Sequence, residues 1–301
     1  MLNKIGKLTI TVGIPASGKS NWAKEQSKIN GTVVIERDTI RAIHHSPNFD
    51  LNLYKITKAK ERDVTSRQHQ FVTEQLLGGN DVIVSDTNLR AGTRTQWEKT
   101  ASILGAEFFV KVFPTPLATC IKRNLKRNHS VPESVLIRME TKMRRYLGKY
   151  VQGDKDESDL QECVIFDIDG TLADMKGVRH PFEWEKVGLD NPITSVVNYY
   201  KMLASTTNTP IFIFSGRDGV CREQTLEWLY QQGINIHPDD VVLREAGDTR
   251  PDTVVKEEMF DMKIKNGYYV SHVVDDRKAV CQMYESMGIK VFNVGGFCAD
   301  F

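Results

Sequence analysis

The stretch KLTITVGIPASGKS, residues 7–20, joins an apolar, β-like run to a glycine-flanked turn that carries a lysine and a serine. Backbone N–H groups of such a turn, at the start of a helix, point into a concavity that fits phosphate oxygens. The lysine would add a mobile positive charge, and the serine a hydroxyl ligand for Mg²⁺. The stretch therefore predicts a site for a nucleoside triphosphate, most simply ATP, rather than a glycine turn of purely structural use. The expected binding residues are Gly13, Ser17, Gly18, Lys19 and Ser20.

A second stretch, CVIFDIDGTL at residues 163–172, also joins an apolar run to a polar turn, but it carries two carboxylates. Asp167, at the end of the expected strand, is placed for in-line attack on phosphorus to form an aspartyl-phosphate. Asp169, beyond a bend that Gly170 makes possible, could protonate the leaving oxygen and then activate water. Because these carboxylates would repel an anionic phosphate, the chemistry requires a metal ion, and we expect Mg²⁺.

Later strand ends supply the other parts of such a phosphatase site. Ser215, Gly216 and Arg217 follow the run at 211–214, and we expect Ser215 to bind phosphoryl oxygens. Lys256 lies in a helical run and would link the nucleophile to the phosphate. Asp275 and Asp276 follow the run at 270–274 and would complete the metal site with Asp167 and Asp169. Unrelated surface carboxylates are the alternative, but three strand-end motifs in this order argue against it.

The length of 301 residues, with 40% hydrophobic and 26% charged residues, is typical of a globular protein with two domains. The segment QGDKDESD at 152–159 is polar and lacks apolar periodicity, so we place a linker at 151–160. This leaves a domain at 1–150 and another at 161–301. Each alternates apolar runs with amphipathic segments, which predicts two α/β domains with parallel sheets and crossover helices.

The expected strands fall four in the first domain and five in the second. They are Leu8–Val12, Val33–Ile35, Val82–Ser85, Phe108–Phe113, Val164–Ile168, Ile211–Phe214, Val241–Leu243, Val270–Val274 and Val291–Val294.

The net charge of +1 conceals an asymmetry between the halves. Residues 1–150 contain 25 Lys and Arg against 13 Asp and Glu, whereas residues 151–301 contain 15 against 26. The resulting +12 suits the first half to an anionic partner, and the −11 includes the carboxylates needed for metal chemistry. Solvated surface charge is the alternative, and charge alone does not identify a nucleic acid.

The five cysteines are odd in number and form no CxxC pair, so the sequence suggests neither a zinc site nor a disulfide framework. Reduced thiols in a cytosolic protein are the simplest interpretation. The first residues run directly into a strand without a separate apolar signal region, and no stretch approaches a membrane-spanning length. We therefore expect a cytoplasmic protein that does not enter a membrane.

The first half also offers an acceptor site for the γ-phosphate. In ERDTIR, residues 36–41, Asp38 stands where a strand meets the ligand crevice of a parallel sheet and could act as the general base. Arg41 would share its helical face and hold a substrate phosphate. A capping aspartate with a solvated arginine is the alternative. Asp86 and Thr87, after the next strand, could orient the magnesium shell or Arg41, although a turn cap would have the same spacing.

A basic run, KRNLKR at residues 122–127, continues a segment that can form a helix from about Leu117. Arg123 and Arg127 are four residues apart, so we expect them to share a helix face. On a lid over the triphosphate they would neutralise charge on the transferring phosphoryl group. A solvated basic face is the alternative.

Taken together, these motifs resemble those of two families joined in one chain. The first half looks like a P-loop kinase with an arginine-bearing lid, and the second like a haloacid-dehalogenase-type phosphatase. The order and the motifs resemble the phage-type bifunctional polynucleotide 5′-kinase/3′-phosphatases over essentially the whole chain. The shared motifs are G-x-P-x-S-G-K-S, R-D-x-x-R, S-D-T-N, K-R-N-x-K-R, F-D-x-D-G-T-L, S-G-R, G-D-T-R, V-V-K-E-E and D-D-R.

That resemblance implies transfer of the ATP γ-phosphate to a 5′-hydroxyl of DNA or RNA, and removal of a 3′-phosphate or 2′,3′-cyclic phosphate. It implies Asp38 as base, Arg41 and Asp86 at the acceptor site, and Lys19, Ser20 and Arg127 on the transferring group with Arg123 nearby. In the phosphatase it implies Asp167 and Asp169 as nucleophile and acid–base. The remaining residues of that site would be Arg179, Arg217, Asp252, Asp275 and Asp276. It further implies a homotetramer, an RNA ligase in the same repair pathway, and a host-cell cytoplasmic location if the chain is phage-encoded.

Three departures from the family pattern stand out. Ala16 replaces a loop glycine, Asn21 replaces a second hydroxyl residue, and the segment 175–180 is one residue longer before Arg179. Two other functions fit part of the sequence: a kinase/phosphatase of a small sugar or nucleoside, which would not need the basic half, and a nucleotide-gated scaffold that binds nucleic-acid ends, which would not need Asp38 or Asp167.

Overall fold

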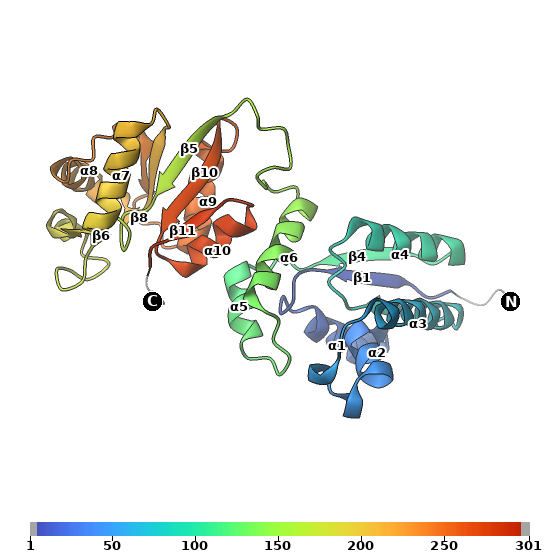
Figure 1. Cartoon of the computed structure of the whole chain (residues 1–301). Helices are drawn as coiled ribbons and strands as arrows, with labels where there is room; N and C mark the ends of the chain where they lie inside the picture. The colour runs from blue at the N-terminus through green and yellow to red at the C-terminus, as the bar shows by residue number, and fades with distance from the viewer. Residues whose placement is uncertain (1–4, 296–301) are drawn as a thin grey trace. The chain divides into compact units, whose positions relative to one another are not determined.

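The computed structural model describes residues 5–295 and divides into two compact units, residues 1–148 and 149–301. Both expected α/β domains are present, each with a parallel sheet (Figure 1). The division falls between Gly148 and Lys149. Val151 is buried and Gln152 pairs with the backbone of Val270, at 2.9 and 3.0 Å, so the start of the expected linker packs on the second unit.

The first unit is built on a four-stranded sheet with the order β2-β3-β1-β4. Its strands are β1 (Leu8–Val12), β2 (Val33–Ile35), β3 (Val82–Val84) and β4 (Phe108–Val112), all parallel. The helices are α1 (Lys19–Asn30), α2 (Arg37–His45), α3 (Lys58–Leu77), α4 (Ala91–Leu104), α5 (Leu117–Asn124) and α6 (Glu133–Tyr146), with short 3-10 turns at Pro47–Phe49 and Leu51–Leu53.

The second unit is built on a five-stranded parallel sheet with the order β11-β10-β5-β8-β9. Its strands are β5 (Gln161–Phe166), β8 (Ile211–Asp218), β9 (Val241–Arg244), β10 (Tyr268–Asp275) and β11 (Val291–Asn293), and β6 (Ala173–Asp174) and β7 (Asn191–Pro192) form a small antiparallel pair. The helices are α7 (Thr194–Thr206), α8 (Arg222–Gln231), α9 (Asp252–Lys263) and α10 (Lys278–Ser286). The 3-10 segments are η3 (Trp184–Leu189), η4 (Gly219–Cys221) and η5 (Pro238–Asp240).

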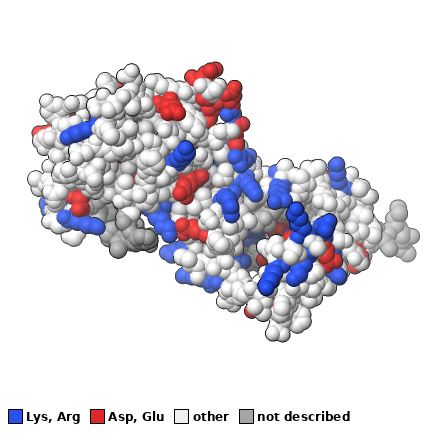
Figure 2. Space-filling model, viewed as in Figure 1, with Lys and Arg blue, Asp and Glu red and all other residues white. Residues whose placement is uncertain are grey.

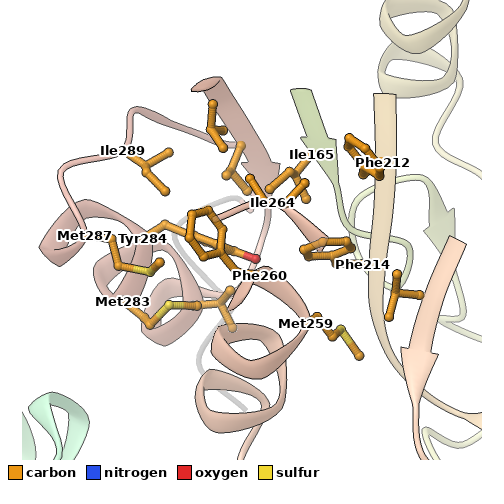
Figure 3. Packing of buried hydrophobic residues seen from close by; sticks show 14 of the residues in the cluster. Ile165, Phe212, Phe214, Met259, Phe260, Ile264, Met283, Tyr284, Met287 and Ile289 are labelled. Carbon is orange, nitrogen blue, oxygen red and sulfur yellow. The ribbon is translucent and has the colours of Figure 1, made fainter. Parts of the chain in front are cut away.

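The sheet of the second unit is apolar on both faces because helices cover both. Ile165 of β5 faces the cluster formed with α9 and α10, whereas its neighbour Phe166 faces the cluster formed with α7 and α8. This alternation follows from the two-residue period of a strand. Figure 3 shows the first cluster, in which Phe260 and Tyr284 lie between the helices and the sheet. The parallel strand ends are thereby fixed at one edge, where the predicted aspartates lie.

The first unit has an excess of positive side chains, and the second an excess of negative ones. Figure 2 shows Lys and Arg gathered over the first unit and Asp and Glu over the loop that precedes β5. On α5 and the turn after it, Lys122, Arg123, Lys126 and Arg127 are all exposed. The basic excess of the first half is therefore available to an anionic partner.

The four cysteines in the described part, Cys120, Cys163, Cys221 and Cys281, are buried and unpaired, and Cys298 lies outside the described residues. Among residues 5–295, no helix combines the length and the apolar character needed to cross a bilayer.

Candidate active sites

The predicted phosphate-binding loop lies between β1 and α1. Gly18 has a φ of +105°, which favours glycine, and α1 begins at the next residue. At Gly13 a Cβ atom would lie 2.7 Å from Ser17 Oγ, so this position also requires glycine. Ala16 has a φ of +62°. The alanine that replaces the family glycine therefore stands at a position whose backbone conformation favours glycine.

The lysine of this loop points back across it. Lys19 Nζ donates to the carbonyl oxygen of Ile14 at 2.6 Å and to Ser17 Oγ at 3.3 Å. Burial lowers the pKa of Lys19 to about 8, and the positive charge of Arg127 acts in the same direction. Ser20 Oγ lies 3.4 Å from Ser85 Oγ at the end of β3. The loop therefore lies directly beside the S-D-T-N segment, as expected for a phosphate site at the sheet edge.

Asp38 and Arg41 contact each other at the start of α2. Arg41 Nη1 lies 2.7 Å from Asp38 Oδ1, and the Asp38 side chain is 58% exposed, so the expected shared face is confirmed. Arg41 also donates from Nε and Nη2 to the two carboxylate oxygens of Glu61, at 2.9 and 2.8 Å. The hydrogen bond from Arg41 lowers the pKa of Glu61 to about 2, despite its partial burial. Glu61, on α3, was not predicted from the sequence.

The Asp86 side chain contacts the start of α2 and does not contact the Arg41 side chain in the described contacts. Its Oδ1 accepts from the backbone N–H of Arg37 at 3.1 Å, and its Oδ2 accepts from Gln68 Nε2 at 2.6 Å. Burial raises its pKa. Among the described contacts, the Arg41 guanidinium binds Asp38 and Glu61 and not Asp86, so of the alternatives for Asp86 the contacts favour the cap, and a place in the magnesium shell stays a prediction. Thr87 contributes its carbonyl oxygen, which accepts from the backbone N–H of Gly13 at 3.2 Å.

The predicted shared helix face of Arg123 and Arg127 is also wrong. Helix α5 ends at Asn124, and Arg127 lies in the turn that follows. The buried Asn124 side chain pairs with the backbone of Val131, donating to its carbonyl at 2.8 Å and accepting from its N–H at 3.0 Å. These two hydrogen bonds close a turn between Asn124 and Val131, and a helix that continued through Arg127 would not allow that turn. Arg127 nevertheless acts on the pKa of Lys19, so its charge lies near the loop.

The phosphatase residues meet at the ends of β5 and β10. Lys256 Nζ, from α9, lies 2.7 Å from a carboxylate oxygen of Asp167 and 2.7 Å from one of Asp275. Burial would lower the Lys256 pKa, but these two negative charges overcome it and hold that pKa above its ordinary value. Burial raises the pKa of Asp167 to about 6, and that of Asp276 to about 6. Such shifts are typical of catalytic sites.

Three of the four predicted acidic metal ligands lie together. Oxygen atoms of Asp167, Asp275 and Asp276 lie within 4.8 Å of one another. Three carboxylate oxygens form a donor set that suits Mg²⁺, a hard cation, so the residues fit the expected metal. The fourth, Asp169, is not in this group, because its carboxylate is bound by arginines.

Gly170 makes the close approach of these acids possible. Its φ is +82°, and a Cβ atom there would lie 2.1 Å from Asp276 Oδ2. Thr171 Oγ1 lies 3.5 Å from Asp167 and 3.4 Å from Asp276. The bend that the sequence indicated therefore both turns the chain and leaves room for the third carboxylate.

The side chains of Arg179 and Arg217 hold Asp169 in place. Arg179 Nη2 lies 2.9 Å and Arg217 Nη2 lies 2.7 Å from Asp169 Oδ1. Both arginines also bind Asp190, at 2.8 and 2.6 Å, and all three of these side chains are fully buried. Asp190, which follows η3, was not predicted because it belongs to no recognised motif. Among the described residues, both arginines bind the carboxylate of Asp169. Arg179 therefore lies in this site, although the segment before it is one residue longer than the family pattern.

The remaining predicted residues lie beside this cluster. Ser215 is fully buried, and its Oγ accepts from the backbone N–H of Arg217 at 3.2 Å. A Cβ atom at Gly216 would lie 2.9 Å from the Asp252 carboxylate. Asp252 in turn pairs with Arg244 and Arg277. Neither arginine was assigned to the site from the sequence, although Arg277 is the last residue of the D-D-R motif.

Comparisons with known proteins match both units. Residues 161–297 match the family described as polynucleotide kinase PNKP phosphatase domain, and residues 8–146 match an AAA domain family. A protein of Autographa californica nuclear polyhedrosis virus, which carries the name bifunctional polynucleotide kinase/RNA ligase, is 30% identical over 98% of this chain. The chain spans 43% of the length of that relative.

Solved structures of several proteins are also similar. A chain of the Pnkp1/Rnl/Hen1 RNA repair complex is 26% identical, with 98% of each chain covered and a TM-score of 0.44. The APS kinase CysC of Mycobacterium tuberculosis, in complex with AMPPNP and APS, is 26% identical over 41% of this chain and 70% of its own, with a TM-score of 0.33.

Proposed function

We propose that this chain heals nucleic-acid ends, because residues 8–146 match an AAA domain family and residues 161–297 match the family of polynucleotide kinase phosphatase domains. It would phosphorylate 5′-hydroxyl ends with ATP and remove phosphate from 3′ ends of DNA or RNA, including 2′,3′-cyclic phosphates. The observation that carries this proposal is the pairing of Lys256 with both Asp167 and Asp275 in one unit, together with the pairing of Asp38 with Arg41 in the other.

In the kinase reaction, Asp38 would accept the proton of the 5′-hydroxyl as its oxygen attacks the γ-phosphorus of ATP. Its 58% exposure leaves the carboxylate open to a substrate. Arg41, fixed by Glu61, would hold the neighbouring phosphate of the chain. Lys19 and Arg127 would stabilise charge on the transferring phosphoryl group, with Arg123 nearby, and ADP would leave.

In the phosphatase reaction, Asp167 would attack the phosphorus and form an aspartyl-phosphate, while Asp169 gives its proton to the departing 3′ oxygen. Asp169 would then take a proton from water, which releases phosphate and restores Asp167. Ser215 and Lys256 would bind phosphoryl oxygens. Asp167, Asp275 and Asp276 would hold a Mg²⁺ ion, which would neutralise charge between the carboxylates and the phosphate, and Ser20 would hold the Mg²⁺ that accompanies ATP.

The likeness to the viral protein that is named a polynucleotide kinase/RNA ligase supports action on RNA ends in a pathway with an RNA ligase. We also propose that the chain forms the homotetramer that the family resemblance implies. Within each chain, the proposed domains are residues 1–150 and 161–301. Mass measurement of the purified chain in solution tests the tetramer.

One assay tests the function. The protein is incubated with Mg²⁺, labelled ATP and an oligonucleotide that carries a 5′-hydroxyl and a 3′-phosphate, and both ends of the product are resolved. Label gained at the 5′ end and phosphate lost at the 3′ end are expected. If neither end changes while ATP still binds, a small-metabolite enzyme or an end-binding scaffold replaces the proposal.

A further inference from the structure

The segment between β6 and β7 carries one exposed aromatic ring, that of Phe182, beside the half-buried ring of Trp184. The Phe182 side chain is 81% exposed, and its ring lies edge-on to that of Trp184, with centroids 6.0 Å apart and planes at 84°. Leu189, at the end of the same 3-10 segment, is 66% exposed. Phe182 and Trp184 therefore form one apolar surface feature, of a kind that is common at binding sites.

Residues of the phosphatase site hold this pair in position. Arg179 Nη2 binds Asp169 at 2.9 Å, while Nη1 donates to the carbonyl oxygens of Pro181, at 3.1 Å, and His180, at 3.4 Å. The guanidinium carbon of Arg179 also lies 5.8 Å from the centre of the Trp184 ring. One buried side chain therefore connects the proposed acid–base to the segment that carries both rings.

The segment is braced from its other side by Glu183. The Glu183 carboxylate accepts from the backbone N–H of His180 at 2.7 Å and pairs with Lys186 Nζ at 2.6 Å. The ring of Phe182 thus projects from a backbone that is fixed at both ends. A fixed, exposed ring can bind a flat partner with little loss of conformational entropy.

We propose that Phe182 and Trp184 form a stacking platform for the base of the nucleotide that loses its 3′-phosphate. The inference rests on the proposed phosphatase function. In that reaction the departing oxygen belongs to the terminal nucleotide, and Asp169 is the group that protonates it. The rings are tied to Asp169, not to the phosphate side formed by Lys256 and Asp275, so they lie on the side of the leaving nucleotide.

Stacking on an apolar ring also predicts the specificity. Every base has a π-face, and stacking on aromatic side chains tolerates any sequence. The π-faces of the Phe182 and Trp184 rings carry no hydrogen-bond donor or acceptor that could distinguish one base edge from another. The platform should therefore favour a terminal nucleotide that has a base over one that lacks it, and should discriminate little among the four bases.

The test measures the phosphatase reaction of Phe182→Ala on two substrates. With a 3′-phosphorylated oligonucleotide, KM should rise about tenfold or more, as expected for the loss of one base stack, while kcat is retained. With acetyl phosphate, which has no ring, the variant should match the unmodified protein. Phe182→Trp should restore the KM, and Tyr230→Ala, at a 73% exposed ring on α8, is the matched control.

A substrate without the terminal base separates stacking from a general effect on the site. The unmodified protein should show the same KM increase with this abasic end, and Phe182→Ala should add nothing further. An unchanged KM of Phe182→Ala on the complete oligonucleotide, or an equal further loss on the abasic end, would overturn the platform. Failure of the proposed function is distinct: the unmodified protein would then hydrolyse acetyl phosphate but leave every oligonucleotide end intact.

Discussion

The ammonium group of Lys256 lies 2.7 Å from the carboxylate of Asp167, although the two residues are 89 positions apart in the chain. Both side chains are almost completely buried, and Lys256 also contacts Asp275. Removing one partner of a buried ion pair leaves an uncompensated charge, which is costly. The pair therefore serves both to fix the nucleophile and to keep its carboxylate beside a positive charge.

Lys256→Met removes this charge and keeps most of the side-chain volume. We expect 3′-phosphatase activity to fall about 100-fold or more, by the loss of a charged group at the phosphoryl site, while kinase activity is unchanged. Lys265→Met is the control, since within residues 5–295 the ion pair of Lys265 is with Asp261 at the surface. A folded Lys256→Met protein that retains full phosphatase activity would show that this lysine has no role in the reaction.

The two activities should separate by single substitutions. Asp38→Ala is expected to abolish 5′-phosphorylation, because it removes the proposed general base. It should leave 3′-dephosphorylation intact, because Asp38 and its partner Arg41 both belong to the first unit. Asp167→Asn is expected to do the reverse, because an amide cannot attack phosphorus. Both products are measured on one oligonucleotide. Loss of both activities from either change would contradict two independent sites.

The sequence predicted the strands and strand-end residues well, because apolar runs and the turns after them are local features. The strand Val33–Ile35 is confirmed residue for residue, and the three-carboxylate group contains Asp167, Asp275 and Asp276. Asp167 directly follows β5, Asp275 is the last residue of β10 and Asp276 follows it, and the carboxyl ends of these parallel strands share one edge.

The partners that orient those residues could not be predicted in the same way. Glu61 lies in the first turn of α3, where an acidic residue is ordinary, and Asp190 follows a short 3-10 segment, so no local pattern marks either of them as a site residue. Their roles depend on tertiary contacts with Arg41 and with Arg179. The end of α5 before Arg127 had a related cause: the Asn124 side chain pairs with a residue seven positions away. Spacing alone therefore overestimated the helix.

Glu61→Gln tests the unpredicted partner of Arg41. The change removes the negative charge of the Glu61 carboxylate, which binds Arg37 and Arg41. The hydrogen bond from Arg41 is the main cause that lowers the pKa of this carboxyl group to about 2. We expect the kinase KM for a 5′-hydroxyl oligonucleotide to rise several-fold, with the KM for ATP and the phosphatase unchanged. Glu74→Gln, on the same helix and bonded only to exposed Gln70 by its side chain, is the matched control. An equal effect of the two substitutions would show that Glu61 does not act through Arg41.

The acidic cluster predicts a linked effect of pH and Mg²⁺ on stability. The pKa values of Asp167 and Asp276 are raised to about 6 in the folded protein, from an ordinary 3.8, first of all by burial. Between these values the folded protein holds protons that the unfolded chain has released. In EDTA this contribution to the free energy of unfolding is present below about pH 4 and is lost as pH rises through 6.

Mg²⁺ should reverse that trend, because it binds the ionised carboxylates and must displace protons at lower pH. Calorimetry should therefore show a larger Mg²⁺-induced increase in Tm at pH 7 than at pH 5. Asp276→Asn should weaken the increase at pH 7 and reduce the pH dependence measured in EDTA, since one titrating group is gone. Asp261→Asn, which changes a half-exposed carboxylate paired with Lys265, should behave as the unmodified protein does. If Mg²⁺ raised Tm equally at both pH values, or equally in Asp276→Asn, the three carboxylates would not form the metal site.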